Sequence, residues 1–171
     1  SASLVGSEMC IRDREGDGPF GDVFDQIESD PKVGGDTWED AEGRLQERAA
    51  ELAIQKAGCG KEAIRYIVAG DLLGQLMASS FGLAGFDKPL FGVYGACSTM
   101  GESIGIGSML VEGGFADYVL AMTSSHFASA EKQFRFPLGY ANQRPKASTW
   151  TVTGSGAVVI CKAVSYTHLT L

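Results

Sequence analysis

Residues 86–126 read FDKPLFGVYGACSTMGESIGIGSMLVEGGFADYVLAMTSSH, and this stretch decides the fold. Two short apolar runs, 89–94 and 118–122, have the length and composition of buried strands. Between them, residues 100–112 are apolar on nearly all sides and carry small glycines, which is typical of a helix buried between layers. A strand, a tight turn, a helix and a second strand in this order predict a right-handed crossover between parallel strands.

The segments before this stretch repeat the alternation. Apolar residues recur at three- and four-residue steps over residues 37–57, which predicts an amphipathic helix with Asp36 or Thr37 as its N-cap. Residues 63–69 (AIRYIVA) predict a strand, and Asp71 is placed to cap a second helix over residues 72–81.

After a long polar loop, with a helix considered around residues 128–134, residues 151–162 (TVTGSGAVVICK) predict a last strand or a hairpin broken at residues 154–156. The whole alternation predicts an α/β fold in which helices cover a mainly parallel sheet.

Composition excludes several classes of protein. The chain has 171 residues and a net charge of −7, so it lacks the basic balance that non-specific nucleic-acid binding needs. Four widely spaced cysteines without a CxxC pair, with only two histidines, predict reduced structural thiols, no metal site and no cofactor. No apolar run reaches the roughly 18 residues of a membrane span, so any membrane association is expected to be peripheral.

The two ends differ from the rest of the chain. Residues 4–14 (LVGSEMCIRDR) show neither helical nor strand periodicity and do not form a signal peptide, and the chain ends in VSYTHLTL. Both strings resemble translated sequencing adaptors, so we interpret residues 1–14 and 164–171 as non-native and residues 15–163 as the native segment. The alternative is a real flexible N-terminus and a real final strand.

Cys97 is the strongest candidate for a catalytic residue. It follows a predicted strand and precedes a predicted helix, where unpaired backbone N–H groups and the positive end of the helix dipole favour a thiolate. Such a cysteine can attack a thioester carbonyl while neighbouring N–H groups stabilise the oxyanion. The alternative is a buried structural cysteine that happens to precede a helix.

The strand–GACS–helix elbow and the following GGFADYVLAMTSS resemble thiolases and β-ketoacyl synthases, which place their nucleophile at this turn. A closer resemblance is to the stage V sporulation protein AD family. It rests on AGDLLGQ (69–75), residues 86–126 as a whole, AEKQFRFP (130–137) and TVTGSGAVVI (151–160), which occur in the expected order and spacing.

This resemblance implies a thiolase-like fold built from two similar halves, of which residues 15–163 form the N-terminal half. It also implies a protein peripheral to the inner membrane of the bacterial spore that binds dipicolinic acid or its calcium chelate. With other stage V A sporulation proteins it would take part in uptake of this ligand into the developing spore and in its release at germination. A homodimer is expected from the habit of the fold.

Residues 127–150 form a basic island in an acidic chain. This segment contains one acidic residue, Glu131, and four basic ones, Lys132, Arg135, Arg144 and Lys146. Aromatic residues such as Tyr140 are interleaved among them. Arginine can hold a carboxylate bidentately and aromatic rings can face a pyridine ring, so with the resemblance Lys132, Arg135 and Tyr140 become candidate ligand-binding residues. A solvated charged loop is the alternative.

His126, which ends TSSH after a strand, is a further candidate ligand-binding residue. A structural, hydrogen-bonded histidine is the alternative reading.

The sequence therefore supports two classes of function. The first is a non-catalytic dipicolinate-binding component of the spore, and the second is an active acyltransferase with Cys97 as its nucleophile. The QFR-x-P and TSSH strings favour the first, because they belong to the sporulation family. The acidic balance of the chain offers little of the basic surface on which an acyl-carrier protein docks.

Overall fold

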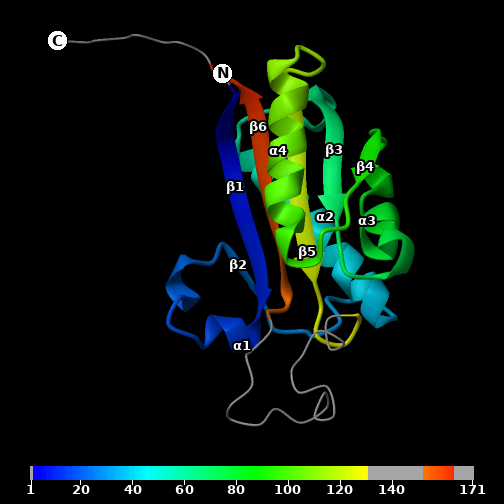
Figure 1. The fold of residues 1–171 in the computed structure, drawn as a ribbon. Coiled ribbons are helices and arrows are strands. Elements are labelled where there is room, and N and C mark those ends of the chain that lie inside the picture. Colours follow the sequence, from blue (N-terminus) through cyan, green and yellow to red (C-terminus); the bar gives the residue numbers. More distant parts are fainter. Residues whose placement is uncertain (1, 131–151, 164–171) are drawn as a thin grey trace, which may run out of the picture.

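The computed structural model describes residues 2–130 and 152–163, within which six strands form one sheet flanked by helices (Figure 1). The strands are β1 (Ala2–Arg12), β2 (Gln26–Glu28), β3 (Ile64–Gly70), β4 (Leu90–Gly92), β5 (Tyr118–Ser125) and β6 (Gly154–Lys162). The α-helices are α1 (Asp13–Gly16), α2 (Trp38–Lys56), α3 (Met77–Gly82) and α4 (Thr99–Glu112).

The strands follow the order β2-β1-β6-β5-β3-β4. β1 pairs in parallel with β2, and β3 pairs in parallel with both β4 and β5. β6 is antiparallel to both of its neighbours, β1 and β5. Within this sheet β6 alone therefore runs against the common direction, which confirms the predicted α/β class with a mainly parallel sheet.

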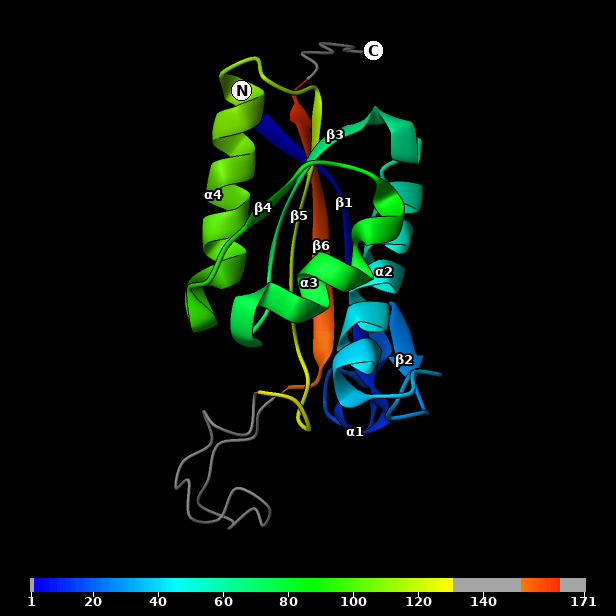
Figure 2. The ribbon, with the colours of Figure 1, turned by 90° about the vertical axis from the view of Figure 1, so that its right-hand side faces the viewer.

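Helices cover both faces of the sheet, with α2 on one side and α4 on the other, and α3 packs against α2 (Figure 2). Leu45 and Ala49 of α2 pack in a cluster of fully buried apolar side chains that includes Met122 of β5. On the opposite face Val111 of α4 packs with Val119 and Ile160. Side chains alternate between the faces along each strand, so β5 and β6 contribute to both cores.

The first long helix forms where its sequence predicts. Thr37 is the N-cap of α2, and its hydroxyl accepts a hydrogen bond from the backbone N–H of Asp40 at 3.1 Å. The helix ends at Lys56, and Gly58 then takes the left-handed conformation with φ +66°.

The N-terminal segment corrects one sequence interpretation. Residues 4–14 lack strand periodicity, yet Ala2–Arg12 form the eleven-residue strand β1, in which Cys10 and Ile11 have no exposed surface. Pairing with β2 and β6 on both sides supplies the backbone hydrogen bonds, and this tertiary context overrides the missing pattern. The pairing does not test where the segment originates, so its non-native origin stays a prediction.

Three other expectations have different outcomes. The predicted helix over residues 72–81 is shorter, because Gln75 and Leu76 take left-handed conformations (φ 59° and 52°) and α3 begins only at Met77. The last strand is continuous rather than a hairpin broken at residues 154–156. Residues 127–130 form a turn, and the rest of the helix considered around residues 128–134 lies outside the described residues.

None of the helices in the described ranges is long and apolar enough to cross a membrane. The same ranges hold no group of three or more His, Cys, Asp or Glu side chains placed to bind a metal ion. The four cysteines are free thiols: Cys10 and Cys161 are buried, Cys59 is half-buried and Cys97 is exposed.

Candidate functional site

Cys97 lies in the strand–turn–helix elbow that the sequence predicts. β4 ends at Gly92, residues Ala96–Ser98 form a 3₁₀ turn, and α4 starts at Thr99. Ala96 has φ +49°, a left-handed conformation that costs a non-glycine residue on the order of 1 kcal/mol. The turn leaves Cys97 exposed beside the first turn of α4.

The buried side chain of Thr99 fixes this elbow. Its hydroxyl accepts a hydrogen bond from the N–H of Gly95 at 3.1 Å and donates one to the carbonyl of Ala96 at 2.9 Å. Gly70, at the end of β3, allows the close approach, because a Cβ there would lie 2.0 Å from the carbonyl oxygen of Val93. Thr99 therefore holds the strained Ala96 conformation, and the segment before it packs closely against the end of β3.

A cavity of about 430 Å³ opens beside Cys97 at the carboxyl end of β5. It is lined by Met9, Ile11, Leu72, Ala96, Cys97, Met100, Thr123, Ser124, Ser125, Val152, Gly154, Ser155 and Gly156. The lining combines apolar side chains with hydroxyls and backbone, and none of these residues is an acid, a base or a histidine. The described residues thus provide a neutral pocket with one thiol.

Hydrogen bonds from side-chain hydroxyls join neighbouring segments of the chain beside this cavity. Thr123 donates to the carbonyl of Gly70 at 3.1 Å, and Ser155 donates to the carbonyl of Thr123 at 3.1 Å. Ser125 donates to the carbonyl of Val152 at 2.6 Å. The last contact brings together the two ends of the connection between β5 and β6 at the rim of the cavity.

His126 is buried rather than placed in the cavity. Its ring has no exposed surface and stacks on Phe127, with ring centroids 5.0 Å apart. Nδ1 accepts the backbone N–H of Ala128 at 3.2 Å, so Nε2, 2.9 Å from the carbonyl oxygen of Pro31, carries the proton and donates it. This geometry favours the structural role that the sequence left open.

A network of buried hydrogen bonds lies on the α2 face of the sheet, at the carboxyl ends of β3 and β5. Gln46 of α2 donates from Nε2 to the hydroxyl of Ser124 at 2.7 Å and to that of Ser79 at 3.0 Å. Each hydroxyl passes a hydrogen bond to a carboxylate: Ser124 donates to Glu42 at 2.8 Å, and Ser79 donates to Asp71 at 2.6 Å. A single amide therefore links two buried acids across α2, α3 and the ends of β3 and β5.

Glu42 is the most perturbed acid of this chain of hydrogen bonds. Burial raises the pKa of Glu42 to about 7, the hydroxyls of Ser129 and Ser124 oppose the rise, and the charges of Asp71 and Glu39 add to it. Ser129 donates to Glu42 at 2.6 Å, which ties the turn after β5 to α2. Sequence reasoning missed Glu42 and Gln46, although both fall on the apolar stripe of the predicted helix.

Asp71 caps a helix as the sequence predicts, but it lies several residues before the start of α3 at Met77. One carboxylate oxygen accepts the N–H of Leu73 at 2.8 Å, and the other accepts the N–H of Ser79, in the first turn of α3, at 2.8 Å. The three remaining candidate ligand residues, Lys132, Arg135 and Tyr140, lie outside the described residues.

Comparison with known proteins relates this arrangement to one family. The family model of Stage V sporulation protein AD matches residues 1–171. The chain is 45% identical over 147 residues to the Stage V sporulation protein AD of Bacillus subtilis (strain 168). The match covers 86% of the chain and 44% of the relative, so the chain spans less than half the length of this curated protein.

Solved structures show the same fold at low sequence identity. The 3-oxoacyl-(acyl carrier protein) synthase III of Pseudomonas aeruginosa PAO1 superposes with a TM-score of 0.64 at 18% identity, covering 97% of this chain and 53% of the synthase. OleA of Xanthomonas campestris gives 0.62 at 18% identity, covering 94% and 56%. These likenesses confirm the predicted thiolase-like architecture, with the chain equivalent to about half of each neighbour.

Proposed function

Because the chain belongs to the stage V sporulation protein AD family, we propose that it is the N-terminal half of a protein that binds dipicolinic acid. This protein takes part in uptake of the ligand into the developing spore and in its release at germination. It acts with other stage V A sporulation proteins and is peripheral to the spore inner membrane.

The cavity beside Cys97 is the observation that carries this proposal. Its volume of about 430 Å³ falls within the range of small-molecule sites, which is roughly 300–1,000 Å³. Apolar side chains such as Leu72 and Met100 suit the faces of a pyridine ring. The neutral lining of the described residues leaves the two ligand carboxylates to be paired from elsewhere.

The connection between β5 and β6 is the part of the chain from which we propose that this pairing comes. Ser125 and Val152, the residues at either end of the connection, both line the cavity and are joined by a hydrogen bond. The chain between Ser125 and Val152 is therefore flanked on both sides by residues that line the cavity. We propose that Lys132, Arg135 and Tyr140 bind the dipicolinate carboxylates from this connection.

Calorimetric titration of an intact homologue with dipicolinate tests the proposal. We expect saturable binding that Arg135→Ala weakens by about ten-fold, as for the loss of one charge-assisted bidentate contact. Arg65→Ala is the matched control, because Arg65 is an exposed arginine stacked on Tyr66 at the other end of β3. The absence of heat at millimolar dipicolinate would rule the binding function out.

An acyltransferase is the second candidate, favoured by one specific observation. Cys97 is an exposed thiol on a strained elbow at a helix start and lines a cavity, as a nucleophile requires. No histidine from residues 2–130 or 152–163 lines that cavity, so a general base would have to come from other parts of the protein. This gap makes the binding function the better supported of the two.

Intact-mass measurement after incubation with an acyl-thioester separates the candidates. A binding protein leaves Cys97 unmodified, whereas an acyltransferase gains one acyl group that is absent from Cys97→Ala. Cys59→Ala is the control, because this half-buried thiol lies away from the cavity lining. A stable adduct confined to Cys97 would favour the enzyme.

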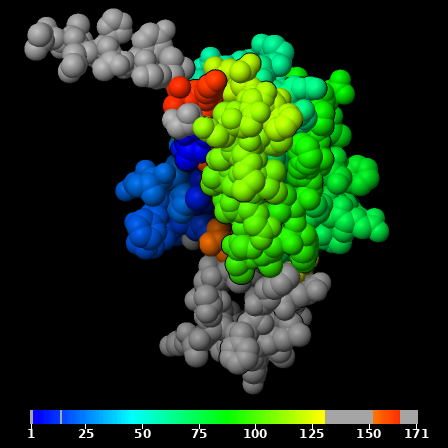
Figure 3. Space-filling view, turned by 45° about the horizontal axis from the view of Figure 1, so that its top comes forward, coloured from blue at the N-terminus to red at the C-terminus, as the bar shows by residue number. Residues whose placement is uncertain are grey.

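The surfaces of the chain support two further partners. Figure 3 shows α4 on the surface of the described part of the chain, and Met109 on this helix is 73% exposed. We propose that the second half of the protein packs there. β4 is an edge strand of the sheet with Phe91 and Tyr94 exposed beside it. Pairing of this edge with a second copy would form the expected homodimer.

A further inference from the structure

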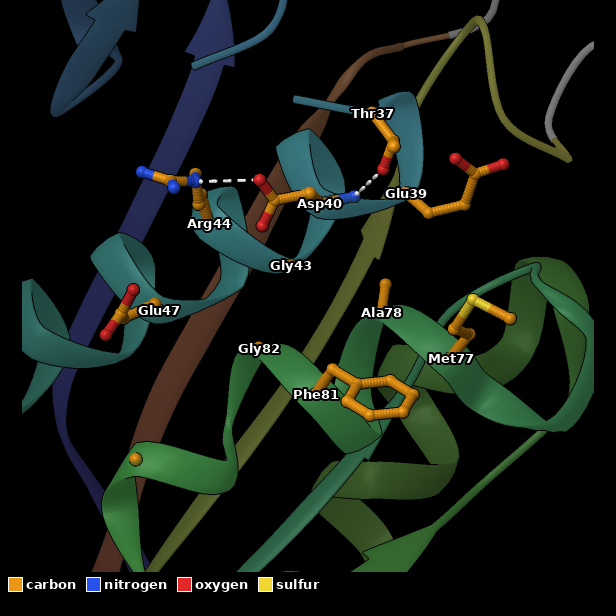
Figure 4. Close-up of a pocket in the computed structure, with 11 residues that line it drawn as sticks. Thr37, Glu39, Asp40, Gly43, Arg44, Glu47, Met77, Ala78, Phe81 and Gly82 are labelled. Atoms are coloured by element: carbon orange, nitrogen blue, oxygen red, sulfur yellow. Dashed lines mark hydrogen bonds and ion pairs between the residues drawn. The ribbon is translucent and has the colours of Figure 1, made fainter. Parts of the chain in front are cut away.

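A groove on the outer layer of the molecule, away from the cavity beside Cys97, runs between α2 and α3. It has a volume of about 530 Å³ and is lined by Thr37, Glu39, Asp40, Gly43, Arg44, Glu47, Met77, Ala78, Phe81, Gly82 and Gly85. Figure 4 shows its two walls, with the charged side chains on α2 and the apolar side chains on α3. No residue of this groove lines the cavity beside Cys97.

The groove is shaped by a backbone contact between its two helices. A Cβ at Gly82 would lie 2.5 Å from the carbonyl oxygen of Gly43, and a Cβ at Gly43 would lie 3.3 Å from the Cα of Gly82. Because neither helix has a side chain at the crossing, the two helices approach closely there, and the groove opens beside this contact.

The α3 wall is apolar and exposed. Met77 and Phe81 are four residues apart, so they share one face of the helix, and they are 45% and 78% exposed. Neither belongs to the buried clusters of the fold. An exposed phenylalanine beside an exposed methionine is costly to leave in water and typical of a recognition surface.

The α2 wall is acidic. It carries Glu39, Asp40 and Glu47 against the single cation Arg44, which is already held by Asp40 at 3.2 Å. Within the described residues Glu39 and Glu47 have no ion-pair partner. The wall therefore presents two uncompensated carboxylates opposite an apolar surface.

We propose that this groove docks a basic amphipathic helix from a partner protein, whose apolar face covers Phe81 and Met77 and whose lysines or arginines meet Glu39 and Glu47. The α2 wall from Thr37 to Glu47 is on the order of 15 Å long at 1.5 Å per residue, which accommodates about three helical turns. Apolar anchors at i and i+3 or i+4 with charges on the flank are the usual pattern of helix-in-groove recognition.

Fluorescence anisotropy with a model peptide tests the groove on the full chain. The probe is a labelled amphipathic peptide of about 14 residues made of leucine and lysine, and the reference is the same peptide with glutamate in place of lysine. We expect the lysine peptide to bind and the glutamate peptide to bind at least about ten-fold more weakly, because its charges meet Glu39 and Glu47 unfavourably.

Four variants locate the binding. Phe81→Ser and Glu47→Lys should each weaken binding of the lysine peptide by about ten-fold. Phe115→Ser removes another exposed phenylalanine (67% exposed), and Glu51→Lys makes the same charge reversal farther along α2, outside the groove lining. These two controls should change the affinity by less than about two-fold, and circular dichroism should show all four variants folded.

Three outcomes would overturn the proposal: no binding of the lysine peptide, equal losses in the groove and control variants, or binding of both peptides alike. A fourth comes from sedimentation velocity. If Phe81→Ser abolishes self-association and leaves peptide binding unchanged, the groove is an interface between copies of this chain instead.

Discussion

The two helical layers of this protein, on opposite faces of the sheet, differ in how charged their helices are. Eight of the 19 residues of α2 are charged, whereas α4 carries only Glu102 and Glu112 among its 14 residues. α2 also encloses a connected polar network against the sheet, while α4 leaves Met109 73% exposed. We conclude that the charged outer side of α2 suits water or a charged partner, whereas the outer side of α4 suits an apolar partner surface.

The interior of the α2 layer should be the most sensitive part of the molecule. Gln46→Ala removes the amide that joins Ser124 to Ser79 and leaves a cavity in a fully buried site. We expect a loss of about 3 kcal/mol in the free energy of unfolding, measured by urea denaturation. Gln55→Ala, on the exposed side of the same helix, should cost less than about 0.5 kcal/mol. Equal losses in the two variants would contradict the structural importance of the network.

The α2 layer should also make stability depend on pH. The pKa of Glu42 is raised by burial from its ordinary 4.5 to about 7 in the folded chain, so folding favours the protonated acid. Its contribution is fully present below pH 4.5 and is lost as the pH rises to 7, which amounts to up to about 3 kcal/mol.

Glu42→Gln checks this sign, because its side chain is neutral at every pH. In urea denaturation between pH 5 and pH 8, the stability of Glu42→Gln relative to the original chain should rise with pH through this window. A difference that stays flat or falls would show that Glu42 is ionised inside the folded protein at low pH.

The α4 layer should instead control association. If its apolar face is uncovered, the 171-residue chain expressed alone should associate and show poor solubility. Met109→Lys should weaken this association by about ten-fold in sedimentation velocity, which corresponds to about 1.4 kcal/mol. Glu112→Gln, at an exposed position on the same helix, controls for the same one-unit change in charge. A monodisperse chain that melts cooperatively without any substitution would contradict the comparison of the two layers.

The prediction with the smallest expected effect tests whether the second half of the protein packs on α4. A Cβ added at Gly105 of α4 meets no atom within 4 Å, so Gly105→Ala should stabilise this chain by about 0.5–1 kcal/mol through helix propensity. If another half of the protein packs on α4, the same substitution in the longer protein should be destabilising instead. Thermal melts of the two forms measure the sign, and stabilisation in both would place the second half elsewhere.

Local signals in the sequence were sufficient for some elements. The limits of α2 agree with its predicted range to within one residue at each end, because the cap at Thr37 and the glycine after the helix act on their immediate neighbours. The elbow at Cys97 was equally clear, since the strand, the turn and the helix follow one another within a few residues.

Other features depended on partners far away in the chain. β1 was missed because its regularity comes from pairing with β6, some 150 residues later, and not from its own side chains. The buried acid Glu42 looked like any other glutamate on a helix, because the serines that satisfy it come from the end of β5 and the turn beyond it.

The sequence by itself therefore determined the α/β class, the family and the position of the thiol, all of which are written in short contiguous motifs. Only the tertiary structure decided that His126 is enclosed, that Glu42 and Gln46 join α2 to the sheet, and that the pocket beside Cys97 is neutral. The physical reason is that burial and hydrogen-bond satisfaction are properties of contacts between segments, whereas periodicity and capping are properties of neighbours along the chain.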